Sequence, residues 1–172
     1  LQTLNALSGG RMGWNVVTSL GGQENFETVG PDRESLYARA SDVVAVVEAL
    51  WRSFPEEAHV VDRAAGIFAD ISQVRPLEGP PLSVAGPLGI PGTGVSRPPL
   101  LTAGESPAAF DFAVRLADGF FTTAVDDEGA VRARSALREA SRRHDRAEGA
   151  VRVLPGLSMH IAETREAALD LG

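Results

Sequence analysis

The stretch "PLLTAGESP", residues 99–107, decides the fold. A short apolar run bounded by proline and glycine is typical of a buried β-strand. Ser106 followed by Pro107 is typical of a helix start, because serine caps the first turn and proline fits the first helical position. The stretch therefore predicts a strand over 99–104 that leads through a tight turn at Gly104 into a helix.

The same order, strand then helix, recurs along the chain. Strands are expected at 14–18, 99–104, 120–123 and 151–154, and helices at 32–54, at 106–117, from Asp126 to about Arg143, and after a cap at Thr164. Residues 1–7 are expected to be the end of a further helix, as in a truncated or processed chain. Alternation of this kind predicts an α/β fold with parallel strands joined by right-handed crossovers. We expect about four βα units in a single domain over residues 1–172.

Residues 55–99 interrupt this pattern. Seven of the eleven prolines lie between Pro76 and Pro99, with glycines among them. A segment this long without secondary structure is typical of either a functional loop or a disordered region. We expect a long Pro/Gly-rich loop, with a short extended piece over 82–85.

Composition excludes several classes of function. The net charge of −7 argues against a nucleic-acid partner, and all 16 basic residues are Arg, so no lysine can form a Schiff base. The sequence has no cysteine, which excludes disulfides, thiolate nucleophiles and cysteine-ligated metals. No apolar run reaches the roughly 18 residues of a membrane span. A cytoplasmic protein without a membrane partner is the expectation.

Candidate ligand contacts lie where strands end, because ligands of parallel α/β folds gather at the carboxyl ends of the strands. Thr18 and Ser19 follow the first expected strand. Gly104 permits close approach of a ligand to the backbone, and the amino end of the next helix, with the Ser106 hydroxyl, suits a phosphate. A plain Ser-Pro helix cap with a glycine turn explains the same residues, so both interpretations stay open.

The histidines and other polar residues give no evidence for a metal site or a catalytic group. The three histidines, His59, His144 and His160, stand without metal-ligand spacing between any two, so no metal site is expected. The sequence assigns no catalytic base.

Four segments in this order carry a resemblance to a known family: "LNALSGGRMGWNVVTS", "LYARASDVVAVVEALW", "GPLGIPGTGVSRPPLLTAGES" and "VLPGL". Together they resemble the flavin-dependent monooxygenases of the bacterial luciferase-like superfamily, in the branch of the nitrilotriacetate and dibenzothiophene-sulfone monooxygenases. The resemblance implies a TIM-type (β/α)₈ barrel. It also implies reduced FMN supplied by a separate flavin reductase, and insertion of oxygen into a small organic substrate.

The resemblance also implies roles for particular residues. The strand tip would line the isoalloxazine side of the flavin, Tyr37 would reach the phosphate, and the turn after the second strand would complete the phosphate cradle. The residues so implied are Asn15, Thr18, Ser19, Tyr37, Ala103, Gly104, Glu105 and Ser106. The sequence departs from the family pattern at Arg33 and Leu36, where the family has His and Arg, and at Glu105, where it has Ser. A carboxylate at 105 would repel a phosphate.

The length implies only part of a barrel, since a whole one takes about 200 residues or more. The chain supplies about half, without the family's first strands and its closing strand. A second hypothesis is therefore a catalytically inactive barrel relative that serves as a structural or interaction module. A half barrel leaves two unpaired sheet edges and an open apolar face, which predicts a homo-oligomer or association with a complementary chain. A third hypothesis is that the sequence omits segments of a longer enzyme.

Overall fold

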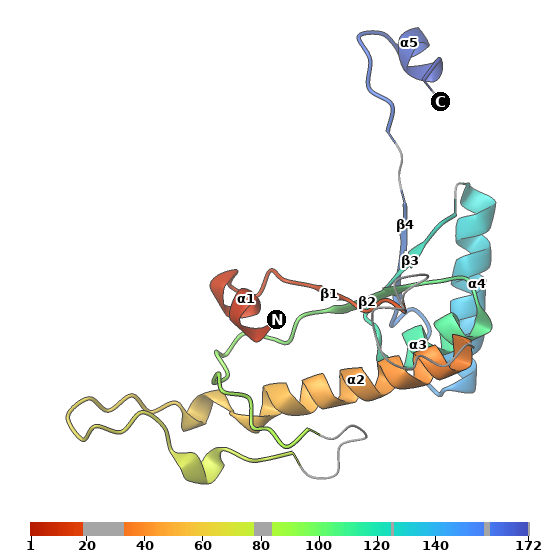
Figure 1. Cartoon of the computed structure of the whole chain (residues 1–172). Coiled ribbons are helices and arrows are strands. Elements are labelled where there is room, and N and C mark those ends of the chain that lie inside the picture. The colour runs from red at the N-terminus through yellow and green to blue at the C-terminus, as the bar shows by residue number, and fades with distance from the viewer. Residues whose placement is uncertain (19–32, 78–83, 125, 157–158, 172) are drawn as a thin grey trace, which may run out of the picture.

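The computed structural model describes residues 1–18, 33–77, 84–124, 126–156 and 159–171 (Figure 1). Its strands are β1 (Trp14–Asn15), β2 (Leu100–Ala103), β3 (Gly119–Thr122) and β4 (Arg152–Pro155). They form one parallel sheet in the order β1-β2-β3-β4. The expected α/β fold with parallel strands is confirmed.

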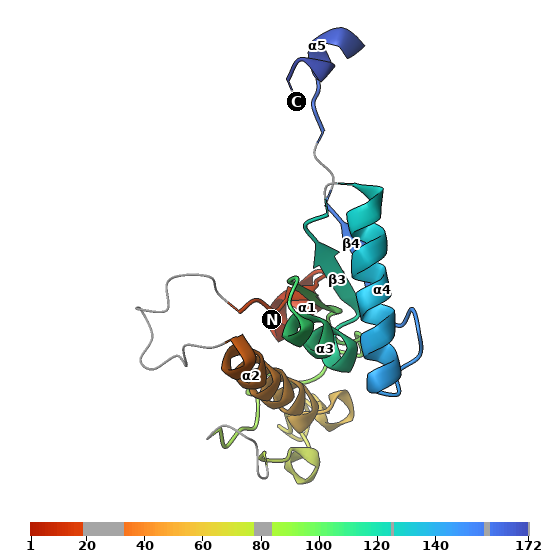
Figure 2. The same cartoon turned by 90° about the vertical axis from the view of Figure 1, so that its right-hand side faces the viewer.

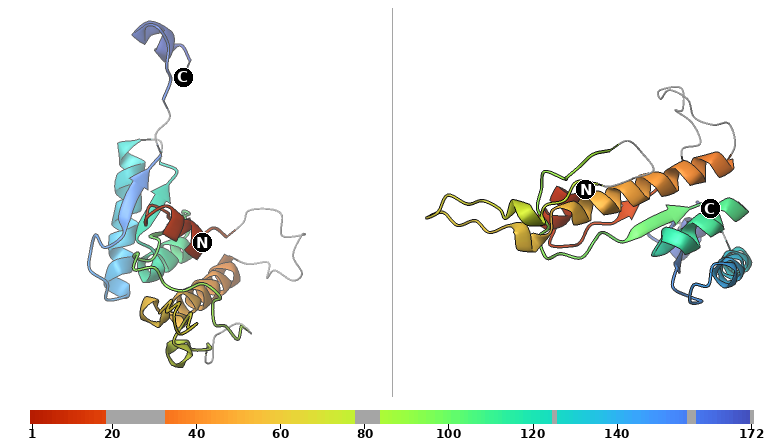
Figure 3. Two further views of the ribbon diagram at one scale, coloured as in Figure 1. Left: turned by 90° about the vertical axis from the view of Figure 1, so that its left-hand side faces the viewer. Right: turned by 90° about the horizontal axis from the view of Figure 1, so that it is seen from below.

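Three helices cover one face of this sheet: α2 (Arg33–Ser53), α3 (Pro107–Leu116) and α4 (Asp127–Arg143) (Figure 2). Between helices and sheet lies a continuous apolar core, whose largest fully buried side chains include Phe120, Leu100, Val44 and Val114. Two short helices stand outside this layer. Helix α1 (Gln2–Leu7) precedes β1, as expected, whereas α5 (Arg165–Leu169) lies away from the sheet in all views (Figure 3). The fourth expected βα unit therefore has its strand and its helix, but that helix does not cover the strand.

The helix starts follow the capping residues. Ser106 accepts a hydrogen bond from the amide of Ala109 at 3.2 Å, Asp126 from Gly129 at 2.7 Å, and Thr164 from Ala167 at 3.2 Å. Each bond satisfies an amide of the first helical turn that has no partner inside the helix. The cap expected at Asp32 lies outside the described residues.

Strand β1 is shorter than the predicted 14–18. Its ladder consists of the Trp14 amide on the carbonyl of Pro99 at 2.9 Å and the Val16 amide on that of Leu101 at 2.8 Å. The carbonyl of Val16 then accepts the side-chain hydroxyl of Thr102 at 3.0 Å. Because a side chain replaces the next backbone donor, the ladder ends at Val16, and Val17 and Thr18 lie beyond it.

Residues 55–99 have more structure than expected in their described parts. They contain the 3₁₀ helices η2 (Glu56–Ala58) and η3 (Ile71–Gln73), and a hairpin in which Asp62 pairs with Ile67. Ser53, at the end of α2, holds the loop: its hydroxyl accepts from the Leu88 amide at 2.8 Å and its carbonyl from Arg75 at 2.9 Å. Residues 84 and 85 form no strand, and the rest of the extended piece expected at 82–85 lies outside the described ranges.

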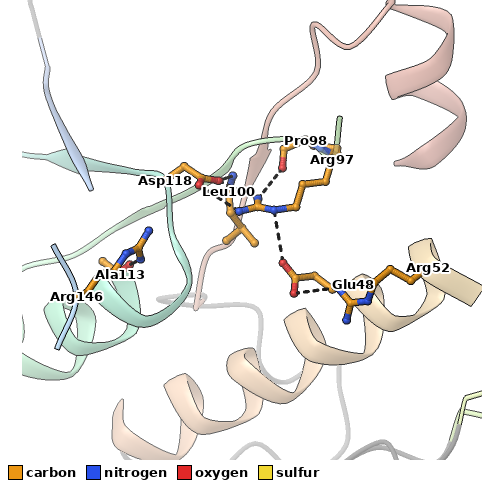
Figure 4. A network of polar contacts seen from close by, with 8 residues as sticks. All are labelled: Glu48, Arg52, Arg97, Pro98, Leu100, Ala113, Asp118 and Arg146. Atoms are coloured by element: carbon orange, nitrogen blue, oxygen red, sulfur yellow. Dashed lines mark hydrogen bonds and ion pairs between the residues drawn. The ribbon is translucent and has the colours of Figure 1, made fainter. Parts of the chain in front are cut away.

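An ion-pair network fixes the amino ends of β2 and β3 (Figure 4). The Asp118 carboxylate accepts from the Leu100 amide at 2.7 Å and from the Arg97 guanidinium at 2.8 and 3.1 Å. Arg97 also lies 3.8 Å from the carboxylate of Glu48 on α2. Burial raises the pKa of Asp118, but the bonds from Leu100 and Arg97 outweigh it, so this pKa is lowered. The network ties two strands and a helix together at the end opposite the expected site.

Candidate functional site

The tips of β1 and β2 lie side by side at the carboxyl edge of the sheet. Asn15 is in register with Leu101, and the Thr102 hydroxyl bonds the carbonyl of Val16. The residues expected to line the ring side of a flavin and those of the expected phosphate turn therefore share one rim. Thr18 is half-buried next to this rim, and Ser19 lies outside the described residues.

The turn after β2 is a cradle that only glycine leaves open. Gly104 has a φ of +148°, and a Cβ there would lie 2.7 Å from the Cβ of Ala109 and 2.9 Å from the hydroxyl of Tyr37. Tyr37 comes from α2, is 8% exposed and packs its ring on Phe112 with centroids 5.5 Å apart. The structure thus brings Tyr37 and the turn together, although 67 positions separate Tyr37 from Gly104 in the sequence.

Three hydrogen-bond donors belong to this cradle or lie next to it. Within the described ranges, neither the amide of Glu105 nor that of Ser106 has an acceptor, and neither does the Tyr37 hydroxyl. Pro107 has no N–H to offer, and the Ala109 amide is occupied by Ser106. Ser106 is therefore a helix cap, as one of the two interpretations holds, yet its hydroxyl proton remains available to a ligand. Two amides at the start of a ten-residue helix and a phenol suit a phosphate.

Glu105 lines a cleft that begins at the Gly104 turn itself. Its carboxylate accepts a hydrogen bond from the hydroxyl of Thr123, which follows β3. Both residues line a cleft of about 440 Å³ at the carboxyl ends of β2 and β3, together with Gly104 of the turn and with Asp126 and Arg132 of the α4 cap and helix. Sequence reasoning missed Thr123, although a hydroxyl residue directly after a strand is the same signal that singled out Thr18.

The face of the sheet away from the helices is open and largely apolar beside the cradle. Leu101 and Leu154 converge over Gly119, where an added Cβ would lie 2.7 and 3.3 Å from their methyl groups. Ala103 pairs with Phe121 on this face, and Phe121 is 40% exposed. This floor of apolar side chains suits a flat aromatic ring more than it suits a charged ligand.

The histidines lie elsewhere. His144 contacts Asp111 at 3.1 Å on the outer surface of α3 and α4, where Arg143 also bonds Asp111 at 2.8 Å. Burial raises the pKa of Asp111, but the bonds from Arg143 and His144 outweigh it and lower this pKa. His59 stacks edge-on against Phe68 in the loop hairpin. In the part of the chain that the structure describes, no group of three or more His, Asp or Glu could hold a metal ion.

No described helix is long and apolar enough to cross a bilayer.

Comparison with known proteins supplies relatives over the whole chain. The dibenzothiophene-sulfone monooxygenase of Rhodococcus erythropolis is 42% identical over 127 residues, which cover 71% of this chain and 28% of that protein. The nitrilotriacetate monooxygenase component A of Aminobacter aminovorans is 30% identical over 171 residues, 96% of this chain and 38% of that protein. The chain thus spans 28% and 38% of the length of these curated relatives.

Comparison with solved structures also finds relatives of this kind. A long-chain alkane monooxygenase superposes with a TM-score of 0.86 at 25% identity, over 99% of this chain and 41% of that one. A riboflavin lyase solved with modified FMN and riboflavin superposes with a TM-score of 0.82 at 26% identity, over 99% of this chain and 38% of that one. These partial superpositions confirm the expected partial barrel. The sequence matches the luciferase-like monooxygenase family over residues 1–171, so the chain belongs to that family.

Proposed function

We propose that this chain forms the phosphate-binding part of an FMN-dependent monooxygenase that acts on a small organic substrate. The observation that carries the proposal is the turn at Gly104, where Ala109 and Tyr37 leave no room for a side chain at the amino end of α3. Bound reduced FMN would supply the electrons that activate oxygen. The riboflavin lyase structure, which contains a modified FMN, supports a flavin as the ligand.

Each residue of the site has a role in this proposal. The Tyr37 hydroxyl and the amides of Glu105 and Ser106 hold the phosphate, and Gly104 lets it approach. Family resemblance assigns Asn15, Thr18 and Ser19 to the ring side and Ala103 to the phosphate turn. The apolar floor of Leu101 and Phe121 would exclude water from one side of the ring.

Partners follow from the same proposal. A relative named as component A supports a system in which a separate flavin reductase delivers reduced FMN. The open sheet face and the two sheet edges support a homo-oligomer. A cytoplasmic location stays a prediction from the sequence.

Flavin titration tests the proposal. FMN added to the chain of residues 1–172 should quench its tryptophan fluorescence saturably, and Tyr37→Phe should weaken binding about tenfold, as expected for one lost hydrogen bond to a charged group. This variant keeps the ring on Phe112, so an unchanged melting temperature serves as its control. Absence of binding at high micromolar FMN would refute the proposal and favour an inactive barrel relative that acts as a structural or interaction module.

A further inference from the structure

A second cleft lies between α4 and β4, apart from the proposed flavin site. It has a volume of about 360 Å³, and part of its lining is apolar: Leu137 on α4, and Val151, Val153 and Leu154 at β4. Val153 and Leu154 are only half-buried, so the strand leaves apolar surface open to an occupant of the cleft.

The cleft also presents positive charge without a counter-charge. Arg134 and Arg152 line it, and neither forms an ion pair within the described ranges. A third arginine, Arg138, reaches the carboxylate of Glu148 only at 3.9 Å. In a chain with a net charge of −7, this group of arginines favours an occupant that is both acidic and apolar.

A buried hydroxyl belongs to the same cleft. Ser141 on α4 lines it and is 3% exposed, yet in the described part of the chain its hydroxyl has no hydrogen-bond partner. A serine hydroxyl can donate to a carboxylate or a carbonyl oxygen. The cleft therefore offers one occupant an apolar surface, unpaired positive charge and an unused donor.

The C-terminal arm, residues 159–171, has the complementary chemistry. Four of its apolar side chains are 60% to 83% exposed: Met159, Ile161, Leu169 and Leu171. Its three acids, Glu163, Glu166 and Asp170, outnumber its one arginine, and among the described residues none of the three forms an ion pair. The arm extends beyond the end of β4, and its helix α5 has no buried residue (Figure 1).

We propose that the arm of one chain docks in the α4–β4 cleft of a second copy, and that the two copies exchange their arms reciprocally. Such an exchange uses only surfaces that each chain already carries, and it closes at two copies. Burial of the apolar side chains drives the docking, and the acids facing the arginines orient it. Since docking depends on concentration, dilute protein keeps the free arm of the structure. The inference is independent of flavin binding.

Light scattering tests the exchange in protein that carries Phe121→Glu, so that the open sheet face does not contribute. We expect the mass of this background to rise from 18.1 kDa toward twice that value between low and high micromolar protein. Two variants reverse charge in this background. The arm variant is Glu163→Arg/Asp170→Arg, and the cleft variant is Arg134→Glu/Arg152→Glu. Each alone should stay at the mass of one chain, because arm and cleft then carry the same charge.

An equal mixture of the two variants gives the sharpest readout. The basic arm of one then faces the acidic cleft of the other, and the acidic arm faces the basic cleft, so the mass should return toward two copies. Arg39→Glu/Arg63→Glu is the matched control for the cleft variant. It makes the same change in net charge at two exposed arginines on α2 and in the loop hairpin, and it should associate like the background.

The other outcomes overturn the inference. A background protein that keeps the mass of one chain at every concentration would mean that the arm stays free or docks in its own cleft. Variants that associate as the background does would place the contact on another surface. A mixture that stays at the mass of one chain would show that arm and cleft do not meet between copies.

Discussion

The structure leaves no room for a side chain at position 104, and this property defines the phosphate cradle proposed at the turn after β2. Gly104→Ala would force a Cβ against Ala109 and Tyr37 at a φ that non-glycine residues rarely adopt. We expect a loss of about 1–3 kcal/mol in the free energy of unfolding and loss of FMN binding. Thermal denaturation and flavin titration measure the two effects.

Gly89→Ala is the control for this substitution. A Cβ at Gly89 meets nothing within 4 Å, so stability should change by less than about 0.5 kcal/mol. If Gly104→Ala behaves like Gly89→Ala, the cradle is not as tight as the distances indicate.

Asp118 predicts a pH dependence of stability. Its pKa is lowered in the folded state, so its contribution is fully present above the pKa of the unfolded chain, about 3.9. This contribution is lost as the pH falls through the lowered pKa. Urea unfolding of wild type and Asp118→Asn should differ most near pH 6 and converge on acidification. Parallel pH curves for the two proteins would contradict the role of the Arg97–Asp118 pair.

Single residues were predictable where local geometry demands them. Gly104 and Ser106 follow from turn and cap chemistry, and Tyr37 from family resemblance. Thr123 could not be found as the partner of Glu105, because the bond between them joins two loops that only the pairing of β2 with β3 brings together. The site residues proposed for the flavin stay predictions until a titration tests them.

At the scale of the element, removing the caps of α4 and α5 should change the stability of the protein by different amounts. Asp126→Ala removes the cap of α4, which packs on the core, and should cost about 1 kcal/mol of stability. Thr164→Ala removes the corresponding bond from α5, which lies away from the sheet and has no buried residue. Chemical denaturation of the body should be unaffected by the second change. An equal cost for both would indicate that α5 packs on the body in solution.

Helix starts were predictable from the sequence, whereas features that depend on contacts between distant elements were not. The caps at Ser106, Asp126 and Thr164 place three helix starts, because each needs only the sequence around it. The end of β1 at Val16 depends on a hydroxyl of β2, and the order within residues 55–99 depends on Ser53. Neither signal is present in the local sequence. The predicted first strand, 14–18, is therefore longer than β1, and residues 55–99 have more structure than the sequence predicts.

At the scale of the molecule, the open face predicts association. Among the described strands, β1 and β4 each pair on one side only, and apolar Phe121 lies on the uncovered face. Light scattering should give a mass above the 18.1 kDa of the chain. Phe121→Glu should shift the mass toward the monomer by placing a charge on that face.

Val131→Glu is the matched control for association. Val131 is 62% exposed on α4, which lies on the covered side of the sheet. A clean monomer in the wild type, or equal effects of the two substitutions, would contradict association through the open face. That residues 1–172 behave as one domain stays a prediction that the same sample can test by its cooperativity of unfolding.

The hairpin of residues 60–68 has a practical use. It projects beyond the C-terminal end of α2, on the side of the molecule away from the starts of α2 and α3 (Figure 1). At its tip, Gly66 has open space around it, and its neighbours are exposed. A peptide epitope or a small fluorescent reporter spliced in at this point would report on the protein from a distance, leaving the rim where a flavin would sit undisturbed.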